Sequence, residues 1–156
     1  MADFSIATLA AGGGVLGIAP MPGRGGTLAA DLRVLATWRP GLVLSLTRRA
    51  RTAALGAALA EAGIAWRHFP VADFGVPAPD APWAPLSEAA RAVLAGRGRV
   101  LVHCAGGCGR SGMVALRLMV ESGEAPQAAL TRLRAARPCA VETAAQQAWA
   151  FAGAPG

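Results

Sequence analysis

The stretch LVHCAGGCGRSGM, residues 101–113, joins a short apolar run to a glycine-rich segment that holds two cysteines and one arginine. The run RVLVH, residues 99–103, predicts a buried strand, and the residues from Ser111 to Ser122 predict a helix. The small residues between them let successive backbone N–H groups turn inward, and the helix start adds unpaired donors and a positive dipole end. We therefore expect an anion-binding loop here, of a size that suits phosphate.

Cys104 and Arg110 stand at the two ends of this loop, in a Cys-x5-Arg pattern. The planar guanidinium of Arg110 can hold two phosphate oxygens at once, which a lysine could not reproduce. The positive field of the loop favours the thiolate form of Cys104, which is the nucleophilic form. The pattern alone is weak evidence, but its place between a predicted strand and a predicted helix makes it specific. The glycines thus explain why the cysteine is expected to be reactive.

Strand and helix patterns alternate on both sides of this loop. The other strand candidates are residues 4–9, 15–18, 42–46 and 64–69, and the other helix candidates are 28–38, 50–62, a helix around Ser87 that ends near Gly96, 126–136 and 143–152. The alternation predicts an α/β sandwich with a mainly parallel central sheet of about five strands flanked by helices. Ligands bind outside the carboxyl ends of such strands, so the loops after Leu46, Phe69 and His103 are expected to form the site.

The composition predicts one folded domain that spans residues 1–156. The hydrophobic share is 54%, the charged share is 15%, and the formal net charge is +6. This charge favours anionic ligands, although the use of arginine for every cationic position is also typical of a compositionally skewed genome. The arginines are scattered and few aromatic residues stand among them, which argues against a nucleic-acid groove. No apolar stretch is long enough for a membrane span, so no membrane partner is expected.

The chain contains three cysteines and two histidines. This number does not predict a disulfide framework, and the histidines are too far apart in the sequence for a zinc motif. We therefore expect reduced thiols, a cytoplasmic location, and neither a metal nor another cofactor.

The segment VHCAGGCGRSG resembles the signature of the cysteine-dependent protein tyrosine phosphatase superfamily. The chain is also similar to the small, atypical dual-specificity members of that superfamily in LGIAPMPG, LVLSLT, HFPVADFGVPAPD and RPCAVETAAQ. The resemblance implies a phosphotyrosine-phosphatase-like sandwich that hydrolyses phosphomonoesters through a phosphocysteine intermediate. The implied substrates are phosphotyrosine, and also phosphoserine and phosphothreonine, in proteins or other phosphomonoesters. Phosphate, sulfate or vanadate is expected to bind in the active site.

The resemblance also implies roles for residues of the signature. Cys104 would be the nucleophile, and Arg110 would stabilise the equatorial oxygens of the phosphoryl group. Ser111 would donate a hydrogen bond to the departing thiolate, and His103 would orient the loop from its base through backbone contacts. The implied phosphate-binding residues are Ala105, Gly106, Gly107, Cys108, Gly109 and Arg110.

Two positions outside the signature complete the implied site. Asp73, in the proline-rich segment 70–82, matches the general acid that protonates the leaving oxygen, although an aspartate before a glycine is also a common turn former. Asp80 is a second candidate for the same role. Gln146 matches a glutamine that positions water in several relatives, and its neighbour Gln147 is the alternative.

Cys108 is the one residue of the loop that this mechanism does not explain. It is either a small residue that points away from phosphate, or a resolving thiol that traps oxidised Cys104 as a disulfide. Cys139 is expected to be structural.

Three arginines, Arg48, Arg49 and Arg51, follow the strand candidate 42–46. They either lie at the mouth of the site, where they would favour an acidic phosphosubstrate, or form a solvated helix start.

Three other functions remain open. The net charge is compatible with an RNA or nucleotide 5′-phosphatase on the same scaffold. A non-catalytic phosphate-binding module would keep the loop but lose the cysteine or the acid, and this chain has both. A sulfurtransferase of the rhodanese type also uses a loop cysteine, but Asp73 and the Arg-Ser-Gly sequence argue against it.

Overall fold

The computed structural model describes residues 4–154, apart from the side chains of residues 50 and 51. The described part contains strands β1 (Ala7–Ala11), β2 (Gly14–Ala19), β3 (Leu42–Ser45), β4 (Trp66–His68) and β5 (Arg99–His103). Its helices are α1 (Leu28–Trp38), α2 (Arg49–Glu61), α3 (Trp83–Ala95), α4 (Gly109–Glu121), α5 (Pro126–Ala136) and α6 (Ala144–Phe151).

The strands form one sheet in the order β1-β2-β5-β3-β4. The pairs β2–β5, β5–β3 and β3–β4 are parallel, and only the edge strand β1 is antiparallel to its neighbour. The hairpin of β1 and β2 turns at Gly12 and Gly13, both with positive φ, which is the backbone conformation that a two-residue hairpin turn requires. The prediction of a mainly parallel sheet of about five strands is confirmed.

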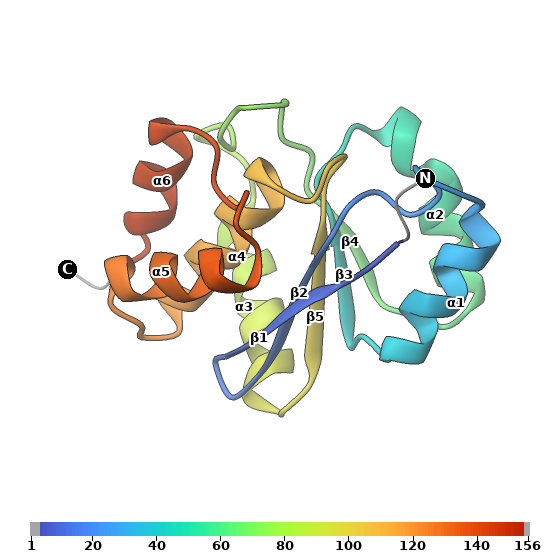
Figure 1. Ribbon diagram of the computed structural model, residues 1–156, viewed down its shortest axis with the longest axis horizontal. Helices are drawn as coiled ribbons and strands as arrows, with labels where there is room; N and C mark the ends of the chain where they lie inside the picture. Colours follow the sequence, from blue (N-terminus) through green and yellow to red (C-terminus); the bar gives the residue numbers. More distant parts are fainter. Residues whose placement is uncertain (1–3, 155–156) are drawn as a thin grey trace.

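Helices cover both faces of this sheet. Helices α1 and α2 lie on one face, and α3, α4, α5 and α6 lie on the other (Figure 1). Alternate residues of the strands serve the two layers: Leu101 of β5 packs with Leu35 of α1, whereas Val100 and Val102 pack with the layer that contains α4. Because both sides of each central strand are buried, these strands read as continuous apolar runs in the sequence.

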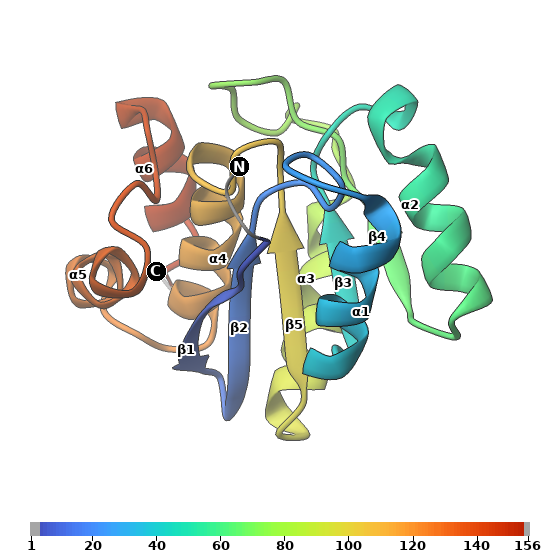
Figure 2. The same ribbon diagram turned by 45° about the vertical axis from the view of Figure 1, so that its right-hand side comes forward.

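Helix α4 is the central helix of its layer. Of its residues from Gly109 to Val120, only Arg117 is not buried. The sheet covers one side of the helix, and α5 and α6 cover another (Figures 1 and 2). The amino-terminal end of α4 is therefore packed from several sides, and the residues of its first turn are held in fixed positions.

Most element boundaries agree with the sequence to within two residues, and the first strand differs by more. The predicted helix 126–136 is α5, and the prolines at 70, 77 and 79 lie in a loop as expected. The first strand is not residues 4–9, because the two-residue turn pairs Ala11 with Gly14 and moves β1 toward the turn. Helix α3 begins at Trp83, so Ser87 lies inside it, and Pro82 occupies its amino-terminal cap position, where a missing N–H costs nothing.

Candidate active site

The signature loop, residues 104–110, leaves the end of β5 and enters the start of α4. Strand β5 lies between β2 and β3, so the loop emerges at the carboxyl ends of parallel strands (Figure 2). The connections that follow β2, β3 and β4 end at the same edge and can add side chains to the site. This is the location that the alternation of strands and helices predicts.

The connection between β2 and α1 holds one side of the signature loop. The carbonyl oxygen of Ala105 accepts hydrogen bonds from the backbone nitrogen of Met21 at 3.0 Å and from Nη1 of Arg24 at 2.7 Å. Gly107 has a φ of +72°, and a Cβ there would come within 2.7 Å of the carbonyl carbon of Ala19. Only glycine can occupy this position without moving the backbone.

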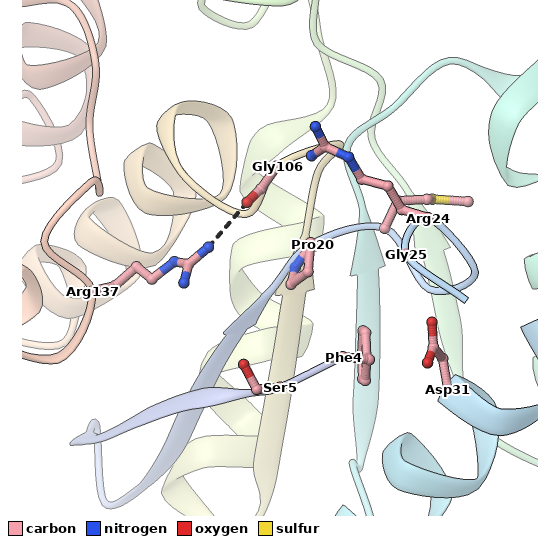
Figure 3. Close-up of a pocket in the computed structure, with 9 residues that line it drawn as sticks. Phe4, Ser5, Pro20, Arg24, Gly25, Asp31, Gly106 and Arg137 are labelled. Atoms are coloured by element: carbon pink, nitrogen blue, oxygen red, sulfur yellow. Dashed lines mark hydrogen bonds between the residues drawn. The ribbon is translucent and has the colours of Figure 1, made fainter. Parts of the chain in front are cut away.

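The segment of residues 137–143, which we call the strap, holds the other side of the loop. Arg137 donates from Nη2 to the carbonyl oxygen of Gly106 at 3.0 Å (Figure 3). Its Nε donates to the carbonyl oxygen of Gly107 at 2.8 Å. One guanidinium thus binds two consecutive carbonyl groups from outside the pocket. Sequence reasoning did not single out Arg137 or Arg24, because their partners are backbone atoms and leave no side-chain pattern to read.

The outward carbonyl groups leave the N–H groups of the loop free. Within residues 4–154, the N–H groups of residues 105–111 donate no hydrogen bond to the protein. They belong to the loop and to the first turn of α4, whose N–H groups have no partner within the helix. Unpaired donors that converge on one small volume form an anion-binding nest. The structure therefore contains the arrangement that the glycine-rich stretch predicts.

Cys104 lies at the floor of this nest. It is 3% exposed, and its Sγ is 3.3 Å from Oγ of Ser111, in the first turn of α4. It lines a pocket of about 180 Å³ together with Asp73, Arg110 and residues of the signature loop. A hydroxyl at this distance can donate a hydrogen bond to a thiolate. The sequence-predicted nucleophile and its predicted hydroxyl partner are thus in contact.

Arg110 reaches across the pocket toward the loop that follows β4. Its Nη1 donates to the carbonyl oxygen of Val71 at 3.0 Å, and its Nη2 lies 3.6 Å from Oδ1 of Asp73. The Arg110 side chain is 8% exposed, whereas that of Asp73 is 64% exposed. The backbone contact fixes the guanidinium plane, and the exposed carboxylate of Asp73 stands at the rim of the pocket.

Gln146 supports the Asp73 loop rather than the pocket. Its Nε2 donates to the carbonyl oxygen of Gly75 at 3.2 Å. Its Oε1 accepts from the backbone nitrogens of Glu142 at 2.8 Å and Thr143 at 3.2 Å, as part of the capping box at the start of α6. The side chain is fully buried and its polar atoms are engaged, so a water molecule would have to compete for them. The water-positioning role of Gln146 stays a prediction.

The alternative candidates lie elsewhere. Asp80 is exposed and is absent from the described residues that line the Cys104 pocket. Gln147 is half-buried on α6 and is also absent from that lining. Glu142, which sequence reasoning did not consider, does line the pocket, and a Cβ on Gly109 would collide with its carboxylate.

His103 lies below the signature loop, at the end of β5, and is fully buried. Nε1 of Trp66 donates to Oγ of Ser45 at 2.7 Å, and that hydroxyl contacts Nε2 of His103. Nδ1 of His103 lies 3.4 Å from the carbonyl oxygen of Cys104. Burial lowers the pKa of His103 from 6.5 to about 4, and the nearby positive charges act in the same direction. The ring is therefore neutral at pH 7 and supports the loop through its side chain as well as through its backbone.

Two cavities adjoin the Cys104 pocket. One, lined by Thr47, Arg48, Asp73 and Arg110 among others, places Arg48 at the mouth of the site. Arg49 is exposed at the start of α2 and absent from that lining, and the side chain of Arg51 lies outside the described residues.

The other cavity, of about 370 Å³, lies beside the signature loop. Figure 3 shows Arg24 and Arg137 on opposite sides of Gly106 at its upper edge, with Phe4 and Asp31 below them. The carboxylate of Asp31 accepts from the backbone nitrogen of Gly23 at 2.6 Å, which fixes the turn that carries Arg24. The cationic edge of this cavity is therefore fixed in place.

The structure corrects the expectation for the cysteines. Cys108, in the signature loop, and Cys139, in the strap, form a disulfide with a Cα–Cα distance of 5.1 Å, and Cys104 is free. The expectation of three reduced thiols is wrong for this state. The reason is the path of the strap, which brings Cys139 against the loop; the sequence separation of 31 hides this proximity in the sequence. The resolving role of Cys108 toward an oxidised Cys104 stays a prediction.

Two classes of feature are absent from residues 4–154. No group of three or more histidine, cysteine, aspartate or glutamate side chains is arranged to hold a metal ion there. None of the helices described has the length and apolar character needed to cross a membrane.

Residues 18–124 match the protein family described as "Polymorphic toxin system, DSP-PTPase phosphatase". The matched segment contains the signature loop, Asp73 and most of the sheet, and ends before α5 and the strap. A search of curated proteins finds no match.

Solved phosphatase structures share the fold over most of the chain. Kinase associated phosphatase, with its catalytic-site cysteine replaced by serine, is 23% identical over 96% of this chain and 93% of its own, with a TM-score of 0.83. Tk-PTP in the active form is 26% identical over 86% of this chain and 87% of its own, with a TM-score of 0.73. PTPMT1 in complex with PI(5)P is 16% identical over 88% of each chain, with a TM-score of 0.71.

Proposed function

The chain belongs to the DSP-PTPase phosphatase family of polymorphic toxin systems, as a small atypical dual-specificity phosphatase of the cysteine-dependent superfamily, and we propose that it hydrolyses phosphomonoesters through a phosphocysteine intermediate. The proposed substrates are phosphotyrosine and also phosphoserine and phosphothreonine in proteins. Residues 1–156 act as a single catalytic domain in this proposal. The observation that carries it is the set of unpaired N–H groups above the free thiol of Cys104.

In the first step the thiolate of Cys104 attacks phosphorus. The S–P bond forms as the P–O bond to the leaving group breaks, and Asp73 gives its proton to the departing oxygen. The equatorial oxygens receive hydrogen bonds from the loop N–H groups and from the guanidinium of Arg110. These donors are already in place before substrate binds, so little reorganisation is needed as charge develops.

In the second step water hydrolyses the phosphocysteine. Asp73, now a carboxylate, takes a proton from the water as its oxygen attacks phosphorus, and the S–P bond breaks with its electron pair on sulfur. Ser111 then donates a hydrogen bond to the leaving thiolate of Cys104, at the 3.3 Å separation that the two atoms already have. Inorganic phosphate leaves and the thiolate is restored.

The substrate class is argued from the size and charge of the site. The Cys104 pocket is small, and the residues described around it include no tyrosine, which the chain lacks entirely. A shallow pocket accepts short and long phosphorylated side chains alike. Arg24 and Arg48 at its edges favour acidic surroundings of the phosphorylated residue. The same charges would suit a nucleotide or RNA 5′-phosphate, which is the second candidate.

An aryl phosphate assay tests the enzymatic claim. The wild-type protein is expected to turn over p-nitrophenyl phosphate in the presence of a chelator, and Cys104→Ser is expected to abolish turnover. The serine variant should still bind vanadate or phosphate, because the N–H groups and Arg110 remain. A folded wild-type protein without Cys104-dependent turnover would contradict the proposal. A panel of phosphotyrosine, phosphothreonine, phosphoinositide and RNA 5′-phosphate then separates the substrate classes.

A further inference from the structure

All three cysteines of the chain meet at the signature loop. Cys104 is free and lines the pocket, and Cys108 lines the same pocket four residues further along the loop. Cys139 is bonded to Cys108 from the outer side and is exposed. The phosphatase mechanism uses the thiol of Cys104 only, so the other two sulfurs have no role in it.

The strap presents Cys139 to the loop without help from the disulfide itself. Two residues before it, Arg137 binds the carbonyl groups of Gly106 and Gly107, and two residues after it the backbone nitrogen of Val141 donates to the carbonyl oxygen of Cys108 at 3.4 Å. Hydrogen bonds on both sides would keep the two thiols adjacent after reduction. A Cα–Cα distance of 5.1 Å allows the S–S bond to form and break without backbone movement.

We infer that Cys108 and Cys139 are a repair dithiol that returns the oxidised catalytic cysteine to its thiolate. The inference rests on the proposed function in one respect, namely that Cys104 is the reactive thiolate. A hydroperoxide oxidises that thiolate to sulfenic acid, and the peroxide oxygen that is not transferred leaves as water or an alcohol.

Two exchanges then complete the repair. The thiolate of Cys108 attacks the sulfenic sulfur of Cys104; an S–S bond forms, the S–O bond breaks, and hydroxide leaves as water after taking a proton. The thiolate of Cys139 next attacks Sγ of Cys108, and the bond between Cys104 and Cys108 breaks with its electron pair on Cys104. In sum, one sulfenic acid and two thiols become one thiol, one disulfide and one water.

The site itself sets the direction of the second exchange. When a thiolate attacks a mixed disulfide of Cys104 and Cys108, the sulfur that forms the more stable thiolate is the better leaving group. Sγ of Cys104 is 3.3 Å from Oγ of Ser111, and Cys104 begins the loop whose N–H groups are unpaired; such donors stabilise a thiolate. Cys104 is therefore the better leaving group. Cys139 lies next to Cys108 and can attack its sulfur.

The observed state is the product of this sequence. Cys104 is free and Cys108 is bonded to Cys139. The thiols of Cys108 and Cys139 have thus supplied the two electrons that reduce the sulfenic acid, and the nucleophile is preserved. A small dithiol or a dithiol protein must reduce Cys108–Cys139 before a second cycle. Cys139 is exposed, so such a reductant can reach the bond from solvent.

Peptide mass spectrometry after thiol alkylation tests the sequence of bonds. Wild-type protein is reduced with a dithiol, freed of it, and treated with one equivalent of hydrogen peroxide. We expect a transient bond between Cys104 and Cys108, followed by the Cys108–Cys139 disulfide with Cys104 alkylated. Cys139→Ser, a change at an exposed position, is expected to stop at the mixed disulfide of Cys104 and Cys108. Cys108→Ala is expected to hold Cys104 as sulfenic acid, and to accumulate sulfinic acid there when a second equivalent of peroxide is added.

Cys104→Ser is the matched control for direct oxidation of the pair. With one equivalent of peroxide it should form Cys108–Cys139 at least about tenfold more slowly than the wild type, because the reactive thiolate is missing. Equal rates in the two proteins would overturn the inference, as would sulfinic acid in place of the mixed disulfide in Cys139→Ser. These readouts follow sulfur chemistry alone, so they stand whether or not the protein hydrolyses a phosphomonoester, and loss of aryl phosphate turnover is scored separately.

Discussion

Lowering the pH from 7.5 to 4 should destabilise this fold through His103. The ring is fully buried in a chain of contacts from Trp66 through Ser45 to the carbonyl oxygen of Cys104. The hydroxyl of Ser45 accepts from Trp66, so its own hydrogen is free to point at Nε2 of His103. That nitrogen must then be unprotonated, and Nδ1 carries the proton toward Cys104. A second ring proton, on Nε2, would point at the hydroxyl hydrogen of Ser45. It would be buried without a hydrogen-bond acceptor.

The magnitude follows from the difference between two pKa values. The ring has a pKa near 6.5 in an unfolded chain and of about 4 in the folded protein. Each pKa unit is worth about 1.4 kcal/mol, so the difference corresponds to about 3 kcal/mol of unfolding free energy. Because the folded state binds the proton more weakly, this stability is fully present above pH 6.5. It is lost as the pH falls from 6.5 to about 4, and no more is lost below that.

Urea unfolding at a series of pH values measures this effect. Other groups titrate in the same range, so the loss of unfolding free energy between pH 7.5 and 4 is compared in wild type and His103→Gln. We expect the wild type to lose about 3 kcal/mol more than the variant. The chain has two histidines, and His68→Gln leaves His103 as the only imidazole, whose titration NMR can follow in the folded state. A ring that titrates near pH 6.5 in that protein would refute the reasoning, as would equal losses of stability in wild type and His103→Gln.

Three further changes test the site. Asp73→Asn should lower kcat by roughly 10²- to 10⁴-fold for an alkyl phosphate and far less for p-nitrophenyl phosphate, and equal losses would remove Asp73 from the acid role. Gln146→Ala should reproduce a weaker form of this leaving-group dependence, because Gly75 loses its hydrogen bond, whereas Gln147→Ala should match wild type in both assays. Arg137→Lys can hold only one of the two loop carbonyl groups in the same geometry, so vanadate affinity should fall about tenfold, the equivalent of one charged hydrogen bond of roughly 1.5 kcal/mol; unchanged affinity would show that the strap does not shape the nest.

The sequence was sufficient where structure depends on neighbours along the chain. A buried strand, a run of small residues and a helix start occupy residues 99–122, and each has a local signal. Their order alone puts Cys104 at a strand end and Ser111 in a first helical turn, so their contact could be predicted. The same holds for the sheet, because strands buried on both faces read as apolar runs and helices between them impose parallel pairing.

The sequence was insufficient where a side chain binds backbone atoms of a distant segment. Arg24 and Arg137 contact loop carbonyl groups 81 and 30 residues away, and any residue type would present the same carbonyl oxygen. Gln146 shows the converse case: its position was anticipated from the resemblance, and the contacts of its amide with the start of α6 and with Gly75 were not. Motif spacing identifies which residues are near a site, and not which way they point.

The cysteines show how a wrong expectation about pairing follows from counting. An odd number of thiols and no regular spacing argue against a disulfide framework, and that remains correct as a statement about the whole fold. A single bond needs only two Cα atoms within reach, and the strap provides this through Arg137 and Val141, whose contacts are with backbone atoms. The residues that turn the loop carbonyl groups outward, and so free the N–H groups for an anion, are therefore the same residues that bring Cys139 to Cys108. The repair dithiol thus arises from the geometry that makes the phosphate nest, and a change that loosens the strap should impair phosphate affinity and thiol exchange together.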